Sequence, residues 1–125
     1  MDPTVLKRIL VIDDEPAVRR LLTDLLAGEG YVVSEAPDGI RGLDRLRDVS
    51  PDLIILDLMM PVMNGCGFAE ACRRMDTRGD VPIIAISAMF DLNSAAATLD
   101  ALGVRACLAK PFDVEALLAL VEQLA

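Results

Sequence analysis

The sequence contains no histidine. This absence excludes histidine general bases, histidine metal ligands and a phosphohistidine within the chain. The three cysteines, Cys66, Cys72 and Cys107, have no C-x-x-C spacing, which favours reduced thiols filling core gaps over a redox or metal site. No apolar run approaches the roughly 18 residues that span a bilayer, and the N-terminus has no signal-peptide pattern. We therefore expect a cytoplasmic protein without membrane contact.

Aromatic and basic residues are also scarce. Only 3% of the chain is aromatic while 54% is hydrophobic, so the core must be aliphatic, and it is large enough to argue against disorder. Acids outnumber bases 20 to 12, giving a formal charge of −8. This balance is a poor match for nucleic acid or anionic lipid, so direct nucleic-acid binding is not expected. The nucleotide-binding motifs G-x-G-x-x-G and G-x-x-x-x-G-K-[ST] do not occur.

Short apolar runs alternate with longer amphipathic segments along the 125 residues. Runs without polar alternation suit strands that are covered on both faces, as in a parallel sheet. Strands are predicted at residues 8–13, 31–35, 53–57, 82–87 and 105–109. Helices are predicted at residues 15–27, 38–49, 65–75, 91–102 and 113–124. We therefore predict an α/β protein of one domain, residues 1–125, with a doubly wound five-stranded parallel sheet and helices on both faces.

Two of the predicted strands end on carboxylates. Asp13 and Asp14 follow the first strand, and Asp57 ends the third. A single aspartate at such a place is usually a turn former or a helix cap. Ligands of open α/β sheets, however, bind beyond the carboxyl ends of the strands, and carboxylates gathered there repel one another unless a cation joins them. Mg²⁺ suits such oxygen ligands, and Lys110, just after the fifth strand, would add positive charge.

Four motifs carry a resemblance to a known family. In order along the chain they are "LVIDDEP", "LIILDLMMPVMNG", "IIAISA" and "LAKPF". Together they resemble the receiver domain of two-component response regulators, of the chemotaxis-receiver type, over essentially the whole chain. The resemblance implies a flavodoxin-like sheet of order 2-1-3-4-5. It also implies a phosphorylation-activated signalling switch of a two-component or phosphorelay system, whose phosphoryl donor is a sensor histidine kinase or a histidine phosphotransfer protein.

The resemblance also implies roles for the acidic residues. Asp57 matches the aspartate that accepts a phosphoryl group from a partner's phosphohistidine. Asp13 and Asp14 match the acidic pair that holds Mg²⁺ together with Asp57, and Met59 matches the position whose main-chain carbonyl binds the metal. The chemistry agrees with the residue types, because a carboxylate can act as a nucleophile and form an acyl phosphate.

Further matches concern the phosphoryl group itself. Ser87 matches the small hydroxyl residue that bonds the phosphoryl group, and Lys110 matches the lysine paired with the phosphoacceptor. The Lys110–Pro111 peptide bond is often cis in this family. The sequence departs from the family at Cys107, where an aromatic residue usually turns inward on phosphorylation. This departure puts the switch mechanism in doubt and leaves open both a drifted switch and a receiver whose surface changes little.

The expected output surface is the face of the fourth helix, fifth strand and fifth helix, which would bind a downstream protein or an output domain. Leu120 lies off the apolar stripe of the last helix and marks a candidate homodimer or partner contact. Met59 and Met89 should lie near the phosphoryl group. Because neither offers a base to hydrolytic water, the resemblance predicts a long-lived phosphorylated form and only slow autodephosphorylation.

Two rival functions remain. An aspartyl-nucleophile phosphatase of the haloacid-dehalogenase type would need Asp-x-Asp after its first strand, whereas the segment at Asp57 is "DLM" and no cap domain is predicted. A pseudo-receiver would bind partners without phosphorylation, although the acidic residues are all present. The sequence names neither the kinase nor the pathway, and it leaves the oligomeric state open.

Overall fold

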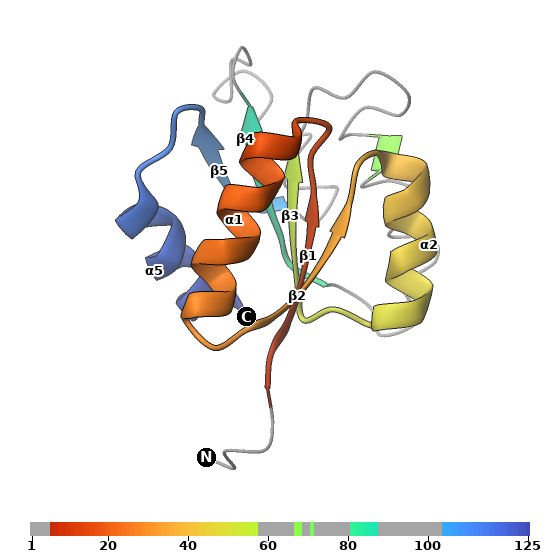
Figure 1. Ribbon diagram of the computed structural model, residues 1–125, viewed down its shortest axis with the longest axis horizontal. Coiled ribbons are helices and arrows are strands. Elements are labelled where there is room, and N and C mark those ends of the chain that lie inside the picture. Colours follow the sequence, from red (N-terminus) through yellow and green to blue (C-terminus); the bar gives the residue numbers. More distant parts are fainter. Residues whose placement is uncertain (1–5, 58–66, 69–70, 72–80, 88–103) are drawn as a thin grey trace.

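A computed structural model describes residues 6–57, 67–68, 71, 81–87 and 104–125 (Figure 1). Its strands are β1 (Arg8–Ile12), β2 (Val32–Ala36), β3 (Leu53–Asp57), β4 (Ile83–Ser87) and β5 (Val104–Ala109). Its helices with described bounds are α1 (Pro16–Gly28), α2 (Gly39–Val49) and α5 (Val114–Leu124). Each bound lies within about one residue of the predicted segment, the usual uncertainty of element ends. The predicted helix 91–102 lies outside the described residues, as does most of 65–75.

The strands form one parallel sheet in the order β2-β1-β3-β4-β5, which confirms the predicted topology. The winding direction reverses at β1, which pairs with β2 on one side and with β3 on the other. A crevice at the carboxyl ends of β1 and β3 is therefore the expected ligand position. The prediction that residues 1–125 form a single domain stays a prediction.

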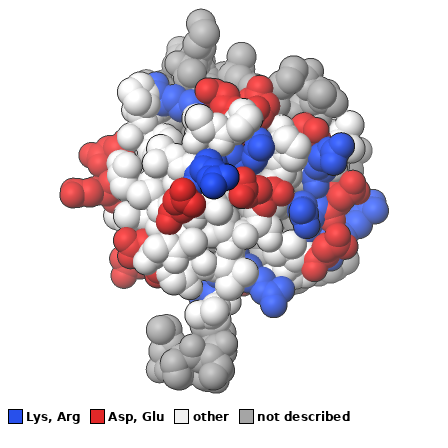
Figure 2. Space-filling view, in the orientation of Figure 1, with Lys and Arg blue, Asp and Glu red and all other residues white. Residues whose placement is uncertain are grey.

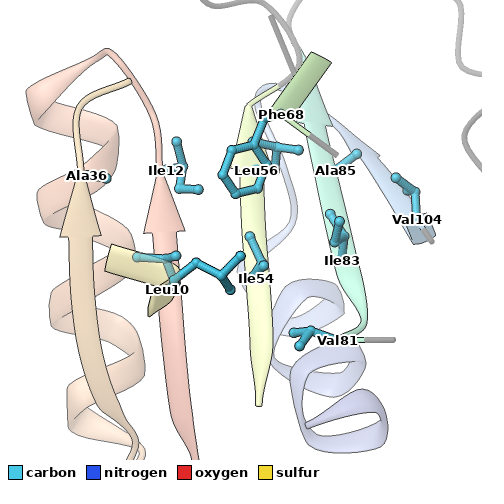
Figure 3. Close-up of a cluster of buried hydrophobic side chains, with 11 residues drawn as sticks. Leu10, Ile12, Ala36, Ile54, Leu56, Phe68, Val81, Ile83, Ala85 and Val104 are labelled. Carbon is cyan, nitrogen blue, oxygen red and sulfur yellow. The ribbon is translucent and has the colours of Figure 1, made fainter. Parts of the chain in front are cut away.

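The central strands β1, β3 and β4 are buried on both faces, as their uninterrupted apolar runs predict. Side chains of β3 alternate between two clusters: Ile54 and Leu56 lie in one, Leu53 and Ile55 in the other. The first cluster includes Phe68 and residues of α2 (Figure 3). The second includes residues of α1 and α5, which lie together on the opposite side of the sheet from α2 (Figure 1). Both clusters are almost entirely aliphatic, as the composition predicts.

Local sequence signals set the helix ends. Asp38 caps α2 by accepting a hydrogen bond from the main-chain N of Arg41 at 2.8 Å. Asp113 begins the predicted helix 113–124, where an aspartate is expected to act as the N-cap. It does cap α5, accepting a hydrogen bond from the main-chain N of Glu115 at 2.9 Å. Pro16 occupies the first turn of α1, where its missing N–H leaves no helical hydrogen bond unmade.

Two expectations about apolar side chains are wrong. In the predicted helix 38–49, the spacing of Ile40, Leu43 and Leu46 predicts one buried apolar stripe. Ile40 is instead 50% exposed, because Gly39 and Gly42 take the positions nearest the sheet. Leu120 was expected to lie off the buried stripe of α5, yet it is partly buried and packs against the cluster shared by α1 and α5. It therefore gives no support to a homodimer contact. Every helix in the described parts of the chain is too short or too polar to traverse a bilayer.

Candidate functional site

Three segments that are far apart in sequence meet at the carboxyl edge of the sheet. Asp13 directly follows β1, and Asp57 is the last residue of β3. Since Ile12 pairs with Leu56, these two aspartates occupy neighbouring positions at the ends of adjacent strands. Lys110 follows β5, which is separated from β3 by β4, so its long side chain crosses the end of β4 to reach Asp57.

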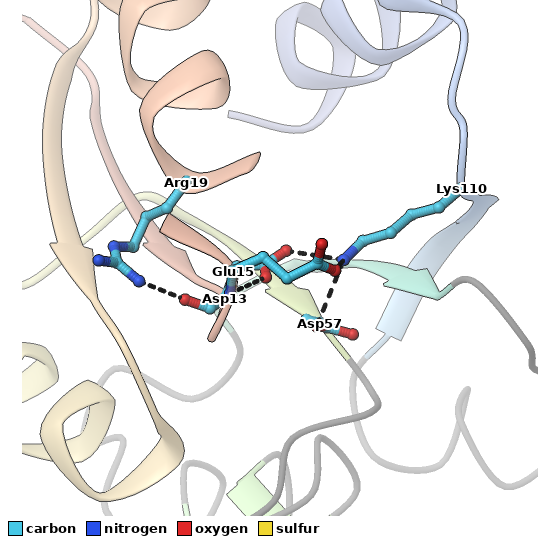
Figure 4. A network of polar contacts seen from close by, with 5 residues as sticks. All are labelled: Asp13, Glu15, Arg19, Asp57 and Lys110. Atoms are coloured by element: carbon cyan, nitrogen blue, oxygen red, sulfur yellow. Dashed lines mark hydrogen bonds and ion pairs between the residues drawn. The ribbon is translucent and has the colours of Figure 1, made fainter. Parts of the chain in front are cut away.

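Lys110 joins the carboxylates into one network (Figure 4). Its Nζ atom lies 2.9 Å from Glu15 Oε1, 3.1 Å from Asp13 Oδ2 and 3.4 Å from Asp57 Oδ2. Asp13 is fully buried and Asp57 is only 2% exposed. Buried carboxylates are costly unless they are paired, and Lys110 is the positive charge that pairs them here. The Lys110–Pro111 peptide bond is cis, as the resemblance implies.

The main chain around Asp13 is fixed from several directions. Its N–H donates to Ala36 O of β2 at 3.2 Å, and its carbonyl accepts from Arg19 Nη1 at 2.7 Å. Its Oδ1 accepts from the main-chain N of Glu15 at 2.8 Å. Arg19 in turn donates from Nε to Glu35 Oε1 at 3.2 Å, which ties α1 to β2. Asp13 is therefore held in one orientation before any ligand arrives.

The electrostatic environment favours a bound cation. Partial desolvation, followed by the hydrogen bond and charge of Asp57, raises the pKa of Asp14 above its ordinary value. Partial burial by itself would lower the pKa of Lys110, but the contacts with Glu15, Asp13 and Asp57 outweigh it and raise that pKa. Counted as ionised, four carboxylates against one lysine leave a local charge of about −3. The site thus holds more negative charge than Lys110 neutralises.

The donor set fits a hard divalent ion. Asp13, Asp14, Glu15 and Asp57 each offer a carboxylate oxygen, and these oxygens all lie within 4.8 Å of one another. Asp13 Oδ2 is buried and accepts no hydrogen bond within the described parts of the chain, although it forms an ion pair with Lys110 at 3.1 Å. Mg²⁺ takes carboxylate oxygens and waters in this way. Asp13, Asp14 and Asp57 would hold it.

Comparison with known proteins identifies the family. Residues 9–122 match the response regulator receiver domain. The chain belongs to this receiver domain family. Receiver domains are signalling modules rather than catalytic enzymes, so the phosphatase alternative is removed. Their partners are histidine kinases. The acidic cluster is typical of the Mg²⁺ site of receiver domains.

Individual relatives agree with this assignment. The receiver is 39% identical over 117 residues to the DNA-binding dual master transcriptional regulator RpaA of Synechocystis, covering 94% of this chain and 48% of that protein. It is 42% identical over 113 residues to the response regulator MprA of a Mycobacterium species, covering 90% of this chain and 47% of that protein. The receiver thus spans about half the length of these curated relatives.

Solved structures agree as well. The chemotaxis protein CheY4 of Vibrio cholerae matches with a TM-score of 0.89 and 29% identity, covering 97% of this chain and 100% of that one. A CheY-like receiver domain protein of Methanospirillum hungatei matches with a TM-score of 0.84 and 26% identity, covering 95% and 93%. Both likenesses support the flavodoxin-like receiver fold over nearly the whole chain.

The receiver structure brings together four of the predicted site residues, Asp13, Asp14, Asp57 and Lys110. Met59 and Met89 lie outside the described residues, and so does the side chain of Ser87, whose main chain ends β4. Cys107, at the usual aromatic position, packs against the cluster that contains Phe68. Burial raises the pKa of its thiol, so the thiol stays protonated at neutral pH.

Sequence reasoning missed two charged residues of this receiver site, Glu15 and Arg19. Glu15 was placed only at the start of a helix, yet its carboxylate makes the shortest contact with Lys110. Arg19 was assigned no role, yet it donates to the Asp13 carbonyl. A usable signal for Glu15 was its place directly after the acidic pair, in "DDE".

Proposed function

We propose that this receiver accepts a phosphoryl group on Asp57 from the phosphohistidine of a sensor histidine kinase or a histidine phosphotransfer protein, with Mg²⁺ at Asp13, Asp14, Asp57 and the Met59 carbonyl. The observation that carries the proposal is the position of Asp57. Its carboxylate is buried at the carboxyl end of β3, 3.4 Å from the Lys110 ammonium group and beside the fixed Asp13.

The transfer exchanges one bond for another. An Asp57 carboxylate oxygen attacks phosphorus, and a P–O bond forms as the P–N bond to the donor imidazole breaks. The electron pair of the broken bond stays on the imidazole nitrogen, which takes up a proton from solvent. Lys110 and the Ser87 hydroxyl would contact the phosphoryl oxygens as charge and hydrogen-bond donors. Mg²⁺, when bound, supplies further neutralisation of those oxygens.

An apolar pocket beside the site supports docking of a protein donor. The pocket has a volume of about 440 Å³ and is lined by residues of α1 and of the segment from Lys110 into α5. Leu21, on its α1 side, is 47% exposed, and Val114 on the other side is also exposed. Glu15 and Lys110 belong to the same lining. A partner packed on this surface would bring its phosphohistidine to the charged edge.

The proposed output surface is the face of the fourth helix, β5 and α5. We propose that phosphorylation changes this face, where a downstream protein or an output domain would bind. Any DNA contact would then belong to that other domain or protein. Figure 2 shows the side of the molecule that carries α1, where acidic side chains lie beside basic ones. Together with the formal charge of −8, this mixed surface supports the absence of direct DNA binding by the receiver.

The decisive test is incubation with acetyl phosphate, with Mg²⁺ or with EDTA, followed by intact mass measurement. One phosphoryl group should be gained only with Mg²⁺, and Asp57→Ala and Asp57→Asn should both abolish the gain. Asp24→Asn, which removes a different exposed carboxylate of α1, should be phosphorylated like wild type. A wild-type protein that binds Mg²⁺ but gains no phosphoryl group would instead favour the pseudo-receiver.

A further inference from the structure

Three carboxylates share Lys110 in the unphosphorylated protein. Its Nζ atom donates hydrogen bonds to Glu15 Oε1 at 2.9 Å and Asp57 Oδ2 at 3.4 Å, and it forms an ion pair with Asp13 Oδ2 at 3.1 Å. Its side chain is only 11% exposed, so the approach from solvent is narrow. A phosphoryl group on Asp57 needs a contact with the same ammonium group. The phosphoryl oxygens would therefore compete with the carboxylates for Lys110.

The surroundings of each carboxylate indicate which one leaves. Asp57 carries the new group and stays. Asp13 is fully buried, and its carbonyl, N–H and Oδ1 atoms all take part in hydrogen bonds, so it cannot withdraw without breaking them. The Glu15 side chain is 57% exposed, and its carboxylate lies beside the Lys110 ammonium group (Figure 4). Moving it breaks one exposed ion pair, an interaction worth little in water.

The main chain of Glu15 is meanwhile fixed. Its N–H donates to Asp13 Oδ1 at 2.8 Å, and its carbonyl accepts from the N–H of Arg19 at 3.0 Å. The residue therefore combines an anchored backbone with a long, movable carboxylate. Rotation of the side chain alone would free Lys110 and leave the position of Asp13 unchanged.

We propose that Glu15 is the exchange partner of Lys110: its carboxylate neutralises the ammonium group while Asp57 is unmodified, and it is displaced by the phosphoryl group. This inference rests on the proposed phosphorylation of Asp57. Glu15 acts through Lys110 and is thus a positioning residue. Its charge also opposes the approach of an anionic phosphodonor, so it slows phosphorylation by small anionic donors in addition to holding the lysine.

The chain offers a direct observation of this exchange, because Lys7 and Lys110 are its only lysines. Lysine labelled with ¹³C at Cε should give two NMR signals, with Lys7 as an internal reference. We expect Glu15→Gln to shift the Lys110 signal in the unmodified protein and to leave it at the wild-type position after phosphorylation with acetyl phosphate and saturating Mg²⁺. Glu29→Gln, an equal charge change at the other end of α1, should shift neither signal.

Kinetics give a second readout. Glu15→Gln should be phosphorylated by acetyl phosphate about two- to fivefold faster than wild type, the factor that corresponds to an exposed ion pair. Glu15→Asp, which keeps the charge but is one methylene shorter, should show a smaller increase. The ratio of the Glu15→Gln rate to the wild-type rate should approach one in 1 M salt, where the screening of charges is nearly complete. Glu29→Gln should react at the wild-type rate at every salt concentration.

The outcomes separate this inference from the proposed function. A wild-type protein that gains no phosphoryl group on Asp57 overturns both. If wild type is phosphorylated but Glu15→Gln shifts Lys110 equally before and after phosphorylation, Glu15 stays on the lysine and only the exchange is wrong. The exchange is also overturned by an unmoved Lys110 signal in the unmodified variant, or by slower phosphorylation of Glu15→Gln at saturating Mg²⁺.

Discussion

Replacement of Asp14 by Asn should make the metal-free protein more stable. Asp14 is exposed, and its carboxylate lies within 4.8 Å of the Asp57 carboxylate. Asp13 and Glu15 flank Asp14 in the unfolded chain as well, so the repulsion that folding adds comes mainly from Asp57. Two unit charges at 4.8 Å repel by about 0.9 kcal/mol at the dielectric constant of water, the appropriate limit for an exposed group.

The free energy of unfolding of Asp14→Asn should therefore exceed that of wild type by about 1 kcal/mol at pH 7 in EDTA, which corresponds to a Tm higher by roughly 3–5 °C. Urea denaturation followed by circular dichroism measures the difference. Asp24→Asn is the matched control, because it makes the same change in net charge on an exposed position of α1 and should stay within about 0.5 kcal/mol of wild type.

The pH dependence has a definite sign. The pKa of Asp14 is raised in the folded protein, so the folded state binds its proton more tightly than the unfolded state does. Wild type therefore gains stability relative to Asp14→Asn as the pH falls through the raised folded pKa, and the gap should close toward pH 3.8, the ordinary value. Burial, the largest cause of the raised pKa, contributes in the same direction as the repulsion.

Metal should reverse the order. Mg²⁺ stabilises wild type in proportion to the logarithm of its concentration relative to the dissociation constant, whereas the variant lacks one ligand and gains less. The reasoning is refuted if Asp14→Asn is no more stable than Asp24→Asn in EDTA. It is equally refuted if the advantage of Asp14→Asn persists unchanged in saturating Mg²⁺.

Other predictions test the packing and the kinetics. A methyl group at Gly42 would lie 2.6 Å from Ile12 Cδ1. Gly42→Ala should therefore lower the free energy of unfolding, measured by urea titration, by about 1–2 kcal/mol, although alanine has the better helix propensity. Gly28→Ala is the control: a methyl group there has no atom within 4 Å, so the change should be neutral or stabilising by up to about 1 kcal/mol. Arg19→Ala should lower the same quantity by about 1.5–3 kcal/mol and weaken Mg²⁺ binding measured by calorimetry, because it frees the Asp13 carbonyl, and Arg19→Lys should restore only part of both. The phosphorylated form should lose its phosphoryl group slowly, because Met59 and Met89 are expected beside that group and neither offers a base to hydrolytic water. Intact mass measured over time checks this, and a half-life of a few seconds would contradict it.

The fold was predictable because each strand is a separate apolar run that ends in a recognisable turn or cap. Parallel topology then brought Asp13 and Asp57 together without any knowledge of side-chain contacts, since the carboxyl ends of neighbouring parallel strands share one edge. Lys110 was predictable for the same reason, because it follows the last strand of the sheet. The residues predicted correctly from the sequence were thus those whose positions follow from the backbone topology.

Side-chain choices were harder to predict. In α2 the buried residues are Gly39, Gly42 and Leu46, so counting only large apolar residues widened the predicted buried face and placed Ile40 in the core. The role of Glu15 depends on a contact with Lys110, which lies 95 positions away in the chain. A glutamate at a helix start has an ordinary explanation in the helix dipole, so its place directly after Asp13 and Asp14 was a weak signal on its own.

The surplus of carboxylates at the carboxyl edge of the sheet suggests how the proposed phosphorylation of Asp57 would favour a second conformation of the receiver. Without a metal ion, the carboxyl edge of the sheet carries more negative charge than Lys110 neutralises. A ligand that adds positive charge there therefore binds the folded state more tightly than the unfolded one. A ligand shifts a conformational equilibrium only by its differential affinity for the two states. In the proposed exchange, the contacts that differ between the two states are those of Lys110, for which Glu15 and a phosphoryl group on Asp57 would compete. If Lys110 keeps Glu15 throughout, this edge supplies no differential contact through the lysine, and the free energy for switching must come from elsewhere in the chain.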